Sequence, residues 1–533
     1  MNGSRTTIVF AFLSTIAAAL PASAQVISDW PTYNGTLASD RFSPLTAINP
    51  TNAENLQVVC TFDTGERTAF ESGLIQVDGA LFATTEHDTI SIDPNTCKLN
   101  WRAHEEFPSS YLGAQRGVAV AAGRVFRGSR NGHVYAYDEK TGARLWDTVV
   151  ADMDKGESAP AAPITWNGLV FIGTAGGDNR GVKGRMYALD AATGKIIWEF
   201  YLVPKSRGDV ERGPQGKGAA PRSTWKNAPG VEITGGGNWT SYSLDTQKGE
   251  LYVPGGNPAP DFAKHLRKGS NLYADSVVVL DARTGDYKRH FSLVPGDFHD
   301  YDVSSAPALF TSKGGTRMMA VTPKDGFIYT YNLESGRRLY RLPVTTQFNT
   351  AAPLSANGVR FCPGSQGGSE WNGPAYDVAH DAILTGQVDW CSTVHLDSND
   401  QIMSVSSAQP WSGSKDGFGL QDPTSKWTGW LTSIDAVSGK QLWQFKAPNP
   451  VMAGVTPTAA NVVFFGDMGG NFFVLDSGSG AKLGQWDLGG AVSGGVITYD
   501  AGAGQKVAVS IGLTSKIWPT PNVTAKIVVL GLK

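Results

Sequence analysis

The chain carries little charge and no large excess of either sign. Asp, Glu, Lys and Arg make up 17% of its 533 residues, and the formal net charge is −3. Binding to nucleic acid depends on many Lys and Arg side chains that neutralise phosphates. Because the sequence has no long basic run that could supply them, it is not expected to bind nucleic acid.

Several catalytic motifs are missing as well. No Gly-x-Gly-x-x-Gly fingerprint follows an expected strand, and the sequence has neither a P-loop nor a Gly-x-Ser-x-Gly nucleophile elbow. Only four cysteines occur, and none lies in the Cys-x-x-Cys-His run that attaches c-type haem. The chain is therefore not expected to carry a haem of its own.

Long apolar runs are absent after the first residues. Residues 1–24 combine a positive start at Arg5, an apolar run and a small-residue cleavage site that ends at Ala24, which is typical of a secretory signal peptide. The run is short and ends at Pro21, which disfavours a membrane anchor. We expect an exported mature protein that begins near Gln25 without a membrane span, and no cysteine follows the signal to take a lipid anchor.

The sequence is rich in glycine (63) and tryptophan (15), and it repeats one phrase seven times. Each phrase predicts a strand that ends in Asp or Asn, a turn with Gly, and a second strand that often ends in Trp. The spacings are 45, 52, 91, 51, 103 and 41 residues, and the shorter ones match the blade length of a propeller. The phrases are DPNTCKLNW from Asp93, DEKTGARLW from Asp138, DAATGKIIW from Asp190, DARTGDYKR from Asp281, NLESGRRLY from Asn332, DAVSGKQLW from Asp435 and DSGSGAKLG from Asp476.

These repeats predict an all-β fold, an eight-bladed propeller that forms one domain over residues 25–533. An eighth, incomplete blade has only three strands, in 493–512 and 525–532, and the N-terminal segment 56–64 is expected to complete it. Such closure removes exposed strand edges. Seven complete blades are expected to begin near Glu71, Gly117, Ser158, Trp239, Ser304, Trp371 and Gly454.

The two long spacings predict insertions within the fourth and sixth blades, roughly at 202–235 and 392–428. Both segments are rich in Gly, Pro, Ser and Lys. Loops of this length in a compact domain are usually functional, and we expect them to cover one face.

One span, 235–325, supplies the groups that could hold a metal beside a flat cofactor. Strands of a propeller converge on an axial funnel, so residues from different blades can meet there. Amide and carboxylate oxygens suit hard cations such as calcium, and a large aromatic face suits a flat ring system. The candidates are Trp239, Asn257, Asp300, Asp302 and Lys324.

The Trp239 to GGNPAP run, followed by the Asp-x-x-Asp-x-Asp run that ends at Asp302, resembles the quinoprotein alcohol dehydrogenases. These are periplasmic propeller enzymes that use pyrroloquinoline quinone (PQQ). The resemblance extends from WPTYNGTLASDRFSPLTAINP to the last blade. It implies oxidation of an alcohol, small or polymeric and primary, secondary or polyol, with PQQ and Ca²⁺ or a lanthanide. Because no haem motif is present, electrons would pass to an external cytochrome c-type acceptor.

The resemblance also implies residue roles. Asp300 matches the catalytic base and Lys324 the cation beside the reactive carbonyl of the quinone. Trp239 matches the floor under the quinone. Glu71, Arg116 and, more weakly, Ser158 match cofactor-binding positions. The metal ligands would be Asp178, Asn257, Asp300 and Asp302, where an aspartate at position 302 resembles the lanthanide-dependent branch; a calcium enzyme in which Asp302 stays outside the ligand shell is the other possibility.

The chain departs from the family pattern at two places. The family has a glutamate ligand where this chain has Asp178 or, with a shifted register, Asn179. The family's vicinal cysteine pair above the quinone is replaced by Ser110 and Tyr111, so either Tyr111 caps the quinone or the pocket is more open. The four cysteines instead favour two disulfides between neighbouring parts of the chain, Cys60 with Cys97 and Cys362 with Cys391.

Simpler explanations exist for each candidate. Asn257, Asp297, Asp300 and Asp302 could be turn residues, and Trp239 could be blade packing. Glu71 and Arg116 could be surface charge at a blade edge, where Ser158 could also lie. His299 is a rival base, since histidine titrates near neutrality. At the level of the whole protein, the alternative is a non-catalytic periplasmic scaffold of the outer-membrane assembly type.

Overall fold

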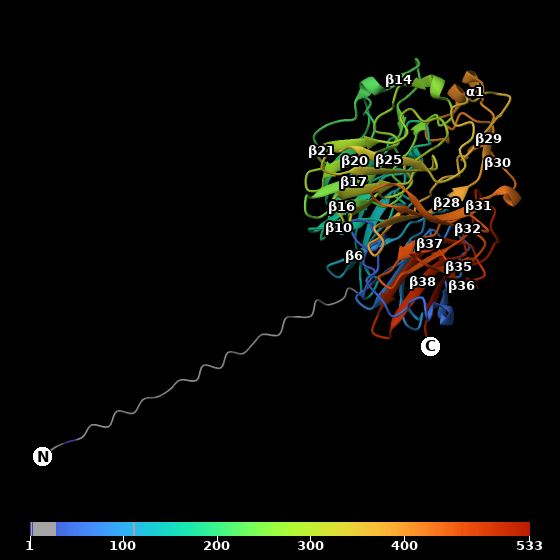
Figure 1. The fold of residues 1–533 in the computed structure, drawn as a ribbon. Coiled ribbons are helices and arrows are strands. Elements are labelled where there is room, and N and C mark those ends of the chain that lie inside the picture. The colour runs from blue at the N-terminus through green and yellow to red at the C-terminus, as the bar shows by residue number, and fades with distance from the viewer. Residues whose placement is uncertain (2, 4–27, 110–111) are drawn as a thin grey trace.

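Eight four-stranded antiparallel sheets form the body of the protein (Figure 1). The computed structural model describes residues 1, 3, 28–109 and 112–533, so the expected signal peptide and the Ser110–Tyr111 pair lie almost wholly outside the described residues. Among the described residues, no helix is long and apolar enough to span a membrane. The prediction of an all-β propeller with eight blades is confirmed.

Seven blades each use four strands in chain order, and short strands of the insertions interrupt two of these sets. The first four are β2–β5 (Ile75–Val77, Ala80–Thr84, Asp88–Ile92, Leu99–His104), β6–β9 (Val118–Ala121, Arg124–Gly128, His133–Asp138, Arg144–Val149), β10–β13 (Ile164–Trp166, Leu169–Gly173, Arg185–Asp190, Ile196–Tyr201) and β16, β17, β20, β21 (Ser243–Asp245, Glu250–Pro254, Ser276–Asp281, Tyr287–Ser292). The next three are β22–β25 (Ala308–Thr311, Arg317–Val321, Phe327–Asn332, Arg338–Pro343), β27, β28, β31, β32 (Ala375–Asp377, Ala382–Asp389, Thr428–Asp435, Gln441–Ala447) and β33–β36 (Thr456–Pro457, Val462–Gly466, Asn471–Asp476, Lys482–Asp487). Buried Val, Ile, Leu and Phe side chains of neighbouring blades form the core between them.

The eighth blade joins the two ends of the chain. β37 (Val492–Asp500), β38 (Gln505–Ile511) and β39 (Lys526–Gly531) supply three strands, and β1 (Gln57–Asp63) pairs antiparallel with β39. The predicted closure by an N-terminal strand is therefore confirmed. A disulfide from Cys60 in β1 to Cys97 ties this strand to the first blade.

The repeated phrase forms the turn between the third and fourth strands of a blade. The Asp138 carboxylate accepts hydrogen bonds from the backbone N–H groups of Lys140 and Thr141 at 3.1 and 2.9 Å. Gly142 then adopts φ 70°, and a Cβ there would lie 2.6 Å from the ring of Trp101 in the preceding blade. That ring donates from Nε1 to the Glu139 carbonyl at 2.8 Å. The Asp, Gly and Trp thus dock the first blade on the second.

The direction of the strands gives the propeller two different ends. In each complete blade the first and second strands are antiparallel. The first strand therefore begins at the same end of the propeller at which the second strand finishes. The residues before the first strand and after the second strand therefore share one end, and the repeated turns lie at the other. We call these the loop end and the turn end.

The insertions emerge at the loop end, but the prediction that segment 202–235 lies within the fourth blade was wrong. Segment 202–235 joins β13 to β16 and so lies between the third and fourth blades, while the fourth blade carries a separate insertion at 255–275. The spacing of the repeated phrases could not separate these two because both fall between the same two turns. Segment 392–428 lies inside the sixth blade, as predicted.

The insertions pack against one another over the loop end, where Figure 1 shows β14, α1, β29 and β30 together. Val231, Leu266, Ile402 and Trp411 belong to one buried apolar cluster that spans all three segments. The small elements are β14 (Lys226–Asn227) with β19 (Arg267–Lys268), β15 (Thr234–Gly235) with β18 (Pro258–Ala259), β26 (Val359–Phe361) with β29 (Ser392–Val394) and β30 (Leu420–Gln421), α1 (Asn399–Ser404), and the 3-10 turns Ala53–Asn55, Met153–Lys155, Arg222–Thr224, Lys264–Leu266 and Thr424–Lys426. The expectation that the insertions cover one face is confirmed.

Candidate active site

A cavity of about 630 Å³ opens at the loop end and collects residues from seven of the eight blades. Each of these residues precedes the first strand of a blade or follows the second, which is why segments far apart in sequence meet here. The candidates from the sequence that line the cavity are Glu71, Arg116, Ser158, Asp178, Asn179, Trp239, Asn257, Asp300, Asp302 and Lys324. All of the predicted site residues are thus brought to one cavity.

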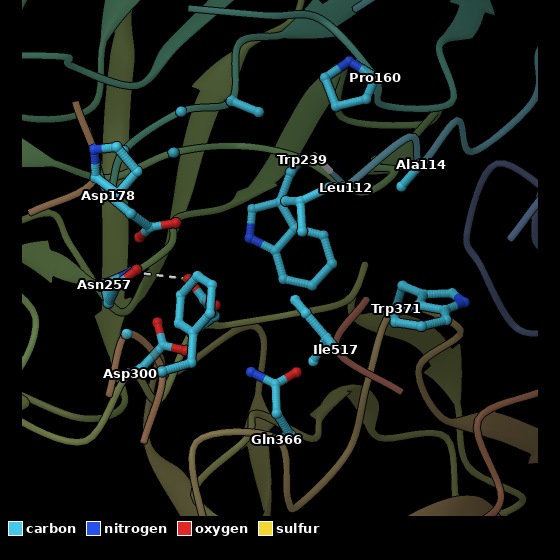
Figure 2. A pocket seen from close by; sticks show the side chains of 18 of the residues that line it. Leu112, Ala114, Pro160, Asp178, Trp239, Asn257, Asp300, Gln366, Trp371 and Ile517 are labelled. Carbon is cyan, nitrogen blue, oxygen red and sulfur yellow. Dashed lines mark hydrogen bonds between the residues drawn. The ribbon is translucent and has the colours of Figure 1, made fainter. Parts of the chain in front are cut away.

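One wall of the cavity is acidic (Figure 2). Carboxylate oxygens of Asp178, Asp261 and Asp300 all lie within 4.8 Å of one another. Asp178 comes from the loop between β11 and β12, Asp261 from the fourth-blade insertion, and Asp300 from the segment before β22. Asn257, directly after β17, points into the same side of the cavity.

The choice between Asp178 and its neighbour is resolved by the direction of the side chains. Asn179 donates from Nδ2 to the Gly156 carbonyl at 2.8 Å, which holds the turn. The backbone carbonyl of Asp178 accepts from Trp411 N–H at 2.7 Å, so the sixth-blade insertion anchors this loop. The Asp178 carboxylate is the group that faces the other two acids.

Lys324, from the loop between β23 and β24, holds two acidic side chains. Its Nζ lies 3.2 Å from Asp300 Oδ2 and 2.7 Å from Asp302 Oδ2. The other oxygen of Asp302 accepts from the Asn257 backbone N–H at 2.9 Å. Asp302 thereby links the ammonium to the segment that carries Asn257, and it lies outside the group of three clustered carboxylates.

Burial controls the electrostatics of this wall. It raises the pKa of Asp178 to about 6, with the charge of Asp302 acting in the same direction. It also raises the pKa of Asp300 and of Asp261 well above the ordinary value, although Lys324 opposes the shift at Asp300. Burial acts against the charge of Lys324, but the charges of Asp300 and Asp302 outweigh it and raise the pKa of the ammonium. Such a wall is stable in its charged form only with a cation beside it.

The rival base does not face the cavity. His299 is 2% exposed and its ring packs against Phe298, Tyr301 and Phe361 at centroid distances of 4.0, 4.9 and 4.5 Å. Burial lowers the pKa of His299 to about 3, so the ring is neutral. Asp297 accepts from the backbone N–H groups of residues 299 and 301, which makes it a turn residue, and the turn presents Asp300 to the cavity.

The opposite side of the cavity is aromatic and cationic. The Arg116 guanidinium lies 4.9 Å from the ring centroid of Trp239 and 4.3 Å from that of Trp371, and it pairs with Glu71. Lys324 Nζ lies 5.6 Å from the Trp239 ring. Trp239 therefore sits between the two cations, with its ring lining the cavity (Figure 2).

Sequence reasoning missed further residues of this site, among them Asp261, Glu370 and Trp371. Asp261 follows the GGNPAP run directly and was overlooked although its carboxylate faces the acidic wall. Glu370 is 4% exposed, and burial raises its pKa to about 7. Trp371 was identified only as the start of a blade. The dipeptide Glu370-Trp371, a charge next to a large ring before an expected first strand, was the available signal.

Comparison with known proteins now places the chain. The family model for the glucose/ethanol/alcohol dehydrogenase β-propeller domain with PQQ matches residues 30–347. The chain belongs to this family. It is 28% identical over 550 residues to the quinohemoprotein alcohol dehydrogenase ADH-IIG of Pseudomonas putida, covering 93% of this chain and 75% of that one. It is also 28% identical to the quinoprotein alcohol dehydrogenase PedH of Pseudomonas putida, over 89% and 84% of the two chains.

Solved structures of this PQQ propeller family share the fold. The quinohemoprotein alcohol dehydrogenase of Comamonas testosteroni superimposes with a TM-score of 0.83 at 23% identity, over 96% of this chain and 81% of that one. A europium-containing methanol dehydrogenase gives a TM-score of 0.82 at 23% identity, over 95% and 98%. The resemblance seen in the sequence is confirmed, and with it the enzyme class, a PQQ-dependent alcohol dehydrogenase.

The residues of this chain fit PQQ and a hard metal ion. The oxygens of the acidic wall, together with the Asn257 amide, are the ligand types that hard cations prefer. Both Asp261 oxygens are buried and have no hydrogen-bond partner. The Trp239 face and the Arg116 fork suit a flat ring system that carries carboxylates.

Proposed function

We propose that this protein oxidises an alcohol in the periplasm and passes the electrons to an external cytochrome c-type acceptor. The observation that carries the proposal is the meeting of Asp300, Lys324 and Trp239 at one cavity with a cluster of carboxylates beside them. A scaffold has no need for buried, uncompensated acids at this place, since they destabilise the fold without a ligand.

In this mechanism Asp178, Asn257 and Asp300 would hold the metal, and Asp302 would be the further ligand predicted from the sequence. When bound, PQQ supplies a two-electron acceptor and the metal a Lewis acid that polarises it. Asp300 takes the proton of the substrate hydroxyl, for which its carboxylate must be ionised. A neighbouring cation keeps it so.

The other residues bind and orient. Trp239 would provide a flat face for the ring system of PQQ. Arg116, fixed by Glu71, pairs with a carboxylate of the cofactor, and Ser158 lies at the same edge of the cavity. Lys324 would supply a positive charge beside a quinone oxygen of the bound cofactor. Closure of the loop end by the insertions keeps water from the reacting atoms.

Two features support the proposed location and acceptor. Cys60–Cys97 and Cys362–Cys391 form disulfides, as predicted, which fits an oxidising compartment. All four cysteines of the sequence are used in these bonds, so no thiol is left to attach a haem within this chain. The substrate belongs to the alcohols, primary, secondary or polyol, and small or polymeric.

The decisive experiment reconstitutes the purified protein with PQQ and either Ca²⁺ or La³⁺ and follows alcohol-dependent reduction of an artificial dye. We expect D300N to lose roughly 10²- to 10⁴-fold in kcat, because the general base is gone. H299F is the matched control. It keeps an aromatic ring in the buried cluster and is expected to retain activity. Full activity in D300N, or its loss in H299F alone, would move the base to His299 and overturn the assignment.

The acceptor, substrate class and location are tested separately. Enzyme reduced by alcohol is mixed with a purified cytochrome c, and rapid haem reduction is expected. A panel of primary, secondary, polyol and polymeric alcohols then ranks substrates by kcat/KM. Cell fractionation is expected to place the processed chain in the periplasm. Failure of PQQ to quench tryptophan fluorescence would remove the proposed function as a whole.

A further inference from the structure

Asp261 is a buried acid without a partner. It is 0% exposed, and neither carboxylate oxygen has a hydrogen bond. The nearby Arg267 donates to the backbone carbonyls of Pro260 and Asp261 at 2.9 and 2.6 Å and to Asn271 Oδ1 at 3.2 Å. Its donors therefore hold the loop in place and leave the Asp261 carboxylate unpaired. An ionised carboxylate in such surroundings needs a cation as partner.

The same carboxylate is directed at the acidic wall. Its oxygen lies within 4.8 Å of oxygens from both Asp178 and Asp300, which come from the blades on either side. In the described part of the chain, the ion pairs of Lys324 join it to Asp300 and Asp302. No ammonium or guanidinium among these residues is paired with Asp261, whereas a small ion between the three oxygens could contact all of them.

Charge decides which ion fits. Asp178, Asp261 and Asp300 together carry three negative charges when ionised, and the ammonium of Lys324 is matched by Asp302. A divalent ion leaves one buried negative charge uncompensated, which is costly in a dry site. A trivalent ion leaves none.

We propose that Asp261 is a direct metal ligand and that, with Asp178 and Asp300, it forms a three-carboxylate site that prefers a trivalent lanthanide to Ca²⁺. This inference rests on the proposed function, because it places the metal in the same cavity. It adds one ligand to the expected set and selects between the two kinds of ion.

The test measures metal binding to PQQ-free protein. Tb³⁺ is titrated with excitation of tryptophan, and Ca²⁺ and La³⁺ are added as competitors. Wild-type protein is expected to bind Tb³⁺ and La³⁺ about 100-fold or more tightly than Ca²⁺, since only the trivalent ion neutralises the buried charge. D261N is expected to weaken Tb³⁺ about 10- to 100-fold and to change Ca²⁺ much less, because ligand charge sets affinity.

Matched variants separate ligation from general electrostatics. Asp275 is also fully buried with both oxygens unpartnered, but it lies outside the three-carboxylate group. D275N is therefore expected to keep the affinity for Tb³⁺. D261E retains the charge and is expected to keep the preference for trivalent ions, which also covers the case in which D261N folds poorly.

The possible failures differ. Equal affinity of wild-type protein for Tb³⁺ and Ca²⁺, or an unchanged Tb³⁺ titration in folded D261N, overturns the inference. PQQ binding by wild-type protein, followed by quenching of its fluorescence, tests the proposed function independently. A protein that binds PQQ and oxidises alcohols while D261N keeps wild-type metal selectivity would leave the function standing and remove Asp261 from the site.

Discussion

The two ends of the propeller are built by opposite rules. At the turn end, similar residues recur from blade to blade: Trp146, Trp198 and Trp443 each donate to a carbonyl in the turn of the next blade, at 3.2, 3.0 and 2.9 Å. At the loop end the residues that line the cavity change from blade to blade, as with Glu71, Arg116 and Asp300 in the segments before the first strands. Repetition marks the contacts that hold the ring of blades together, and its absence marks the chemistry.

This contrast predicts that substitutions at the turn end lower stability and leave activity, whereas those at the loop end lower activity or, where a buried charge is removed, raise stability. Four experiments test it, in order of the size of the expected effect.

The largest effect is expected for W198A at the turn end. Trp198 is 2% exposed, its ring lies against Gly285, and it packs 6.1 Å from the ring of Phe171. Removal should lower the free energy of unfolding by about 3–5 kcal/mol, as for other buried aromatic side chains. Denaturant unfolding gives this value, and kcat per bound PQQ should stay at the wild-type level in the folded protein. A large drop in kcat would contradict the claim that the turn end is separate from the chemistry.

The second-largest effect is expected for K324M at the loop end. Methionine fills the space of the lysine stem but leaves Asp300 and Asp302 without the ammonium. We expect kcat to fall about 10²- to 10³-fold, the usual loss when one group that stabilises an oxyanion is removed. Steady-state kinetics at saturating PQQ measures it. Near wild-type kcat with reduced stability would instead show that Lys324 is structural.

The two disulfides form a matched pair, one where the eighth blade closes and one at the loop end. C60A/C97A should lose about 2–4 kcal/mol of stability, because the link that ties the closing strand to the first blade constrains the unfolded chain. Activity should persist. The Cys362–Cys391 disulfide adjoins Pro363, whose carbonyl accepts from the Tyr301 hydroxyl at 2.6 Å. The C362A/C391A variant is therefore expected to lower kcat as well. Equal kinetics for both variants would contradict the contrast.

The smallest effect is a pH dependence at Glu370. Burial raises its pKa from 4.5 to about 7, so the folded state binds a proton more tightly than the unfolded state. Stability from this group is therefore present below pH 4.5 and is lost as the pH rises to about 7. E370Q removes the titration and should be more stable than wild type at pH 8 by roughly 1–3 kcal/mol, at 1.36 kcal/mol per pKa unit.

Calorimetry of the PQQ-free proteins at pH 5 and pH 8 measures this difference. The advantage of E370Q should shrink at pH 5, where the wild-type carboxyl is largely protonated. E334Q is the control, because Glu334 is an exposed acid at the turn end. An advantage of E370Q that does not change with pH would point to packing instead of charge.

Much of this protein could be predicted from its sequence, because the information is local. A strand that ends in Asp, a Gly turn and a following Trp make a hairpin wherever they occur, so repeats of that phrase fixed the all-β class, the number of blades and the closure by residues 56–64. The resemblance around Trp239 and Asp300 pointed to the enzyme class and the right cavity. These features depend on neighbouring residues and on spacing.

Other features were decided only by the tertiary structure. No spacing shows that 202–235 joins two blades, that His299 is enclosed by three aromatic rings, or that Asp178 and not Asn179 faces the acids. Asp261 could not be recognised as part of the site, since its partners lie 83 positions before it and 39 after it in the sequence. The physical reason is that the strength of a charge depends on burial and on its neighbours in space, and those exist only once the blades have closed.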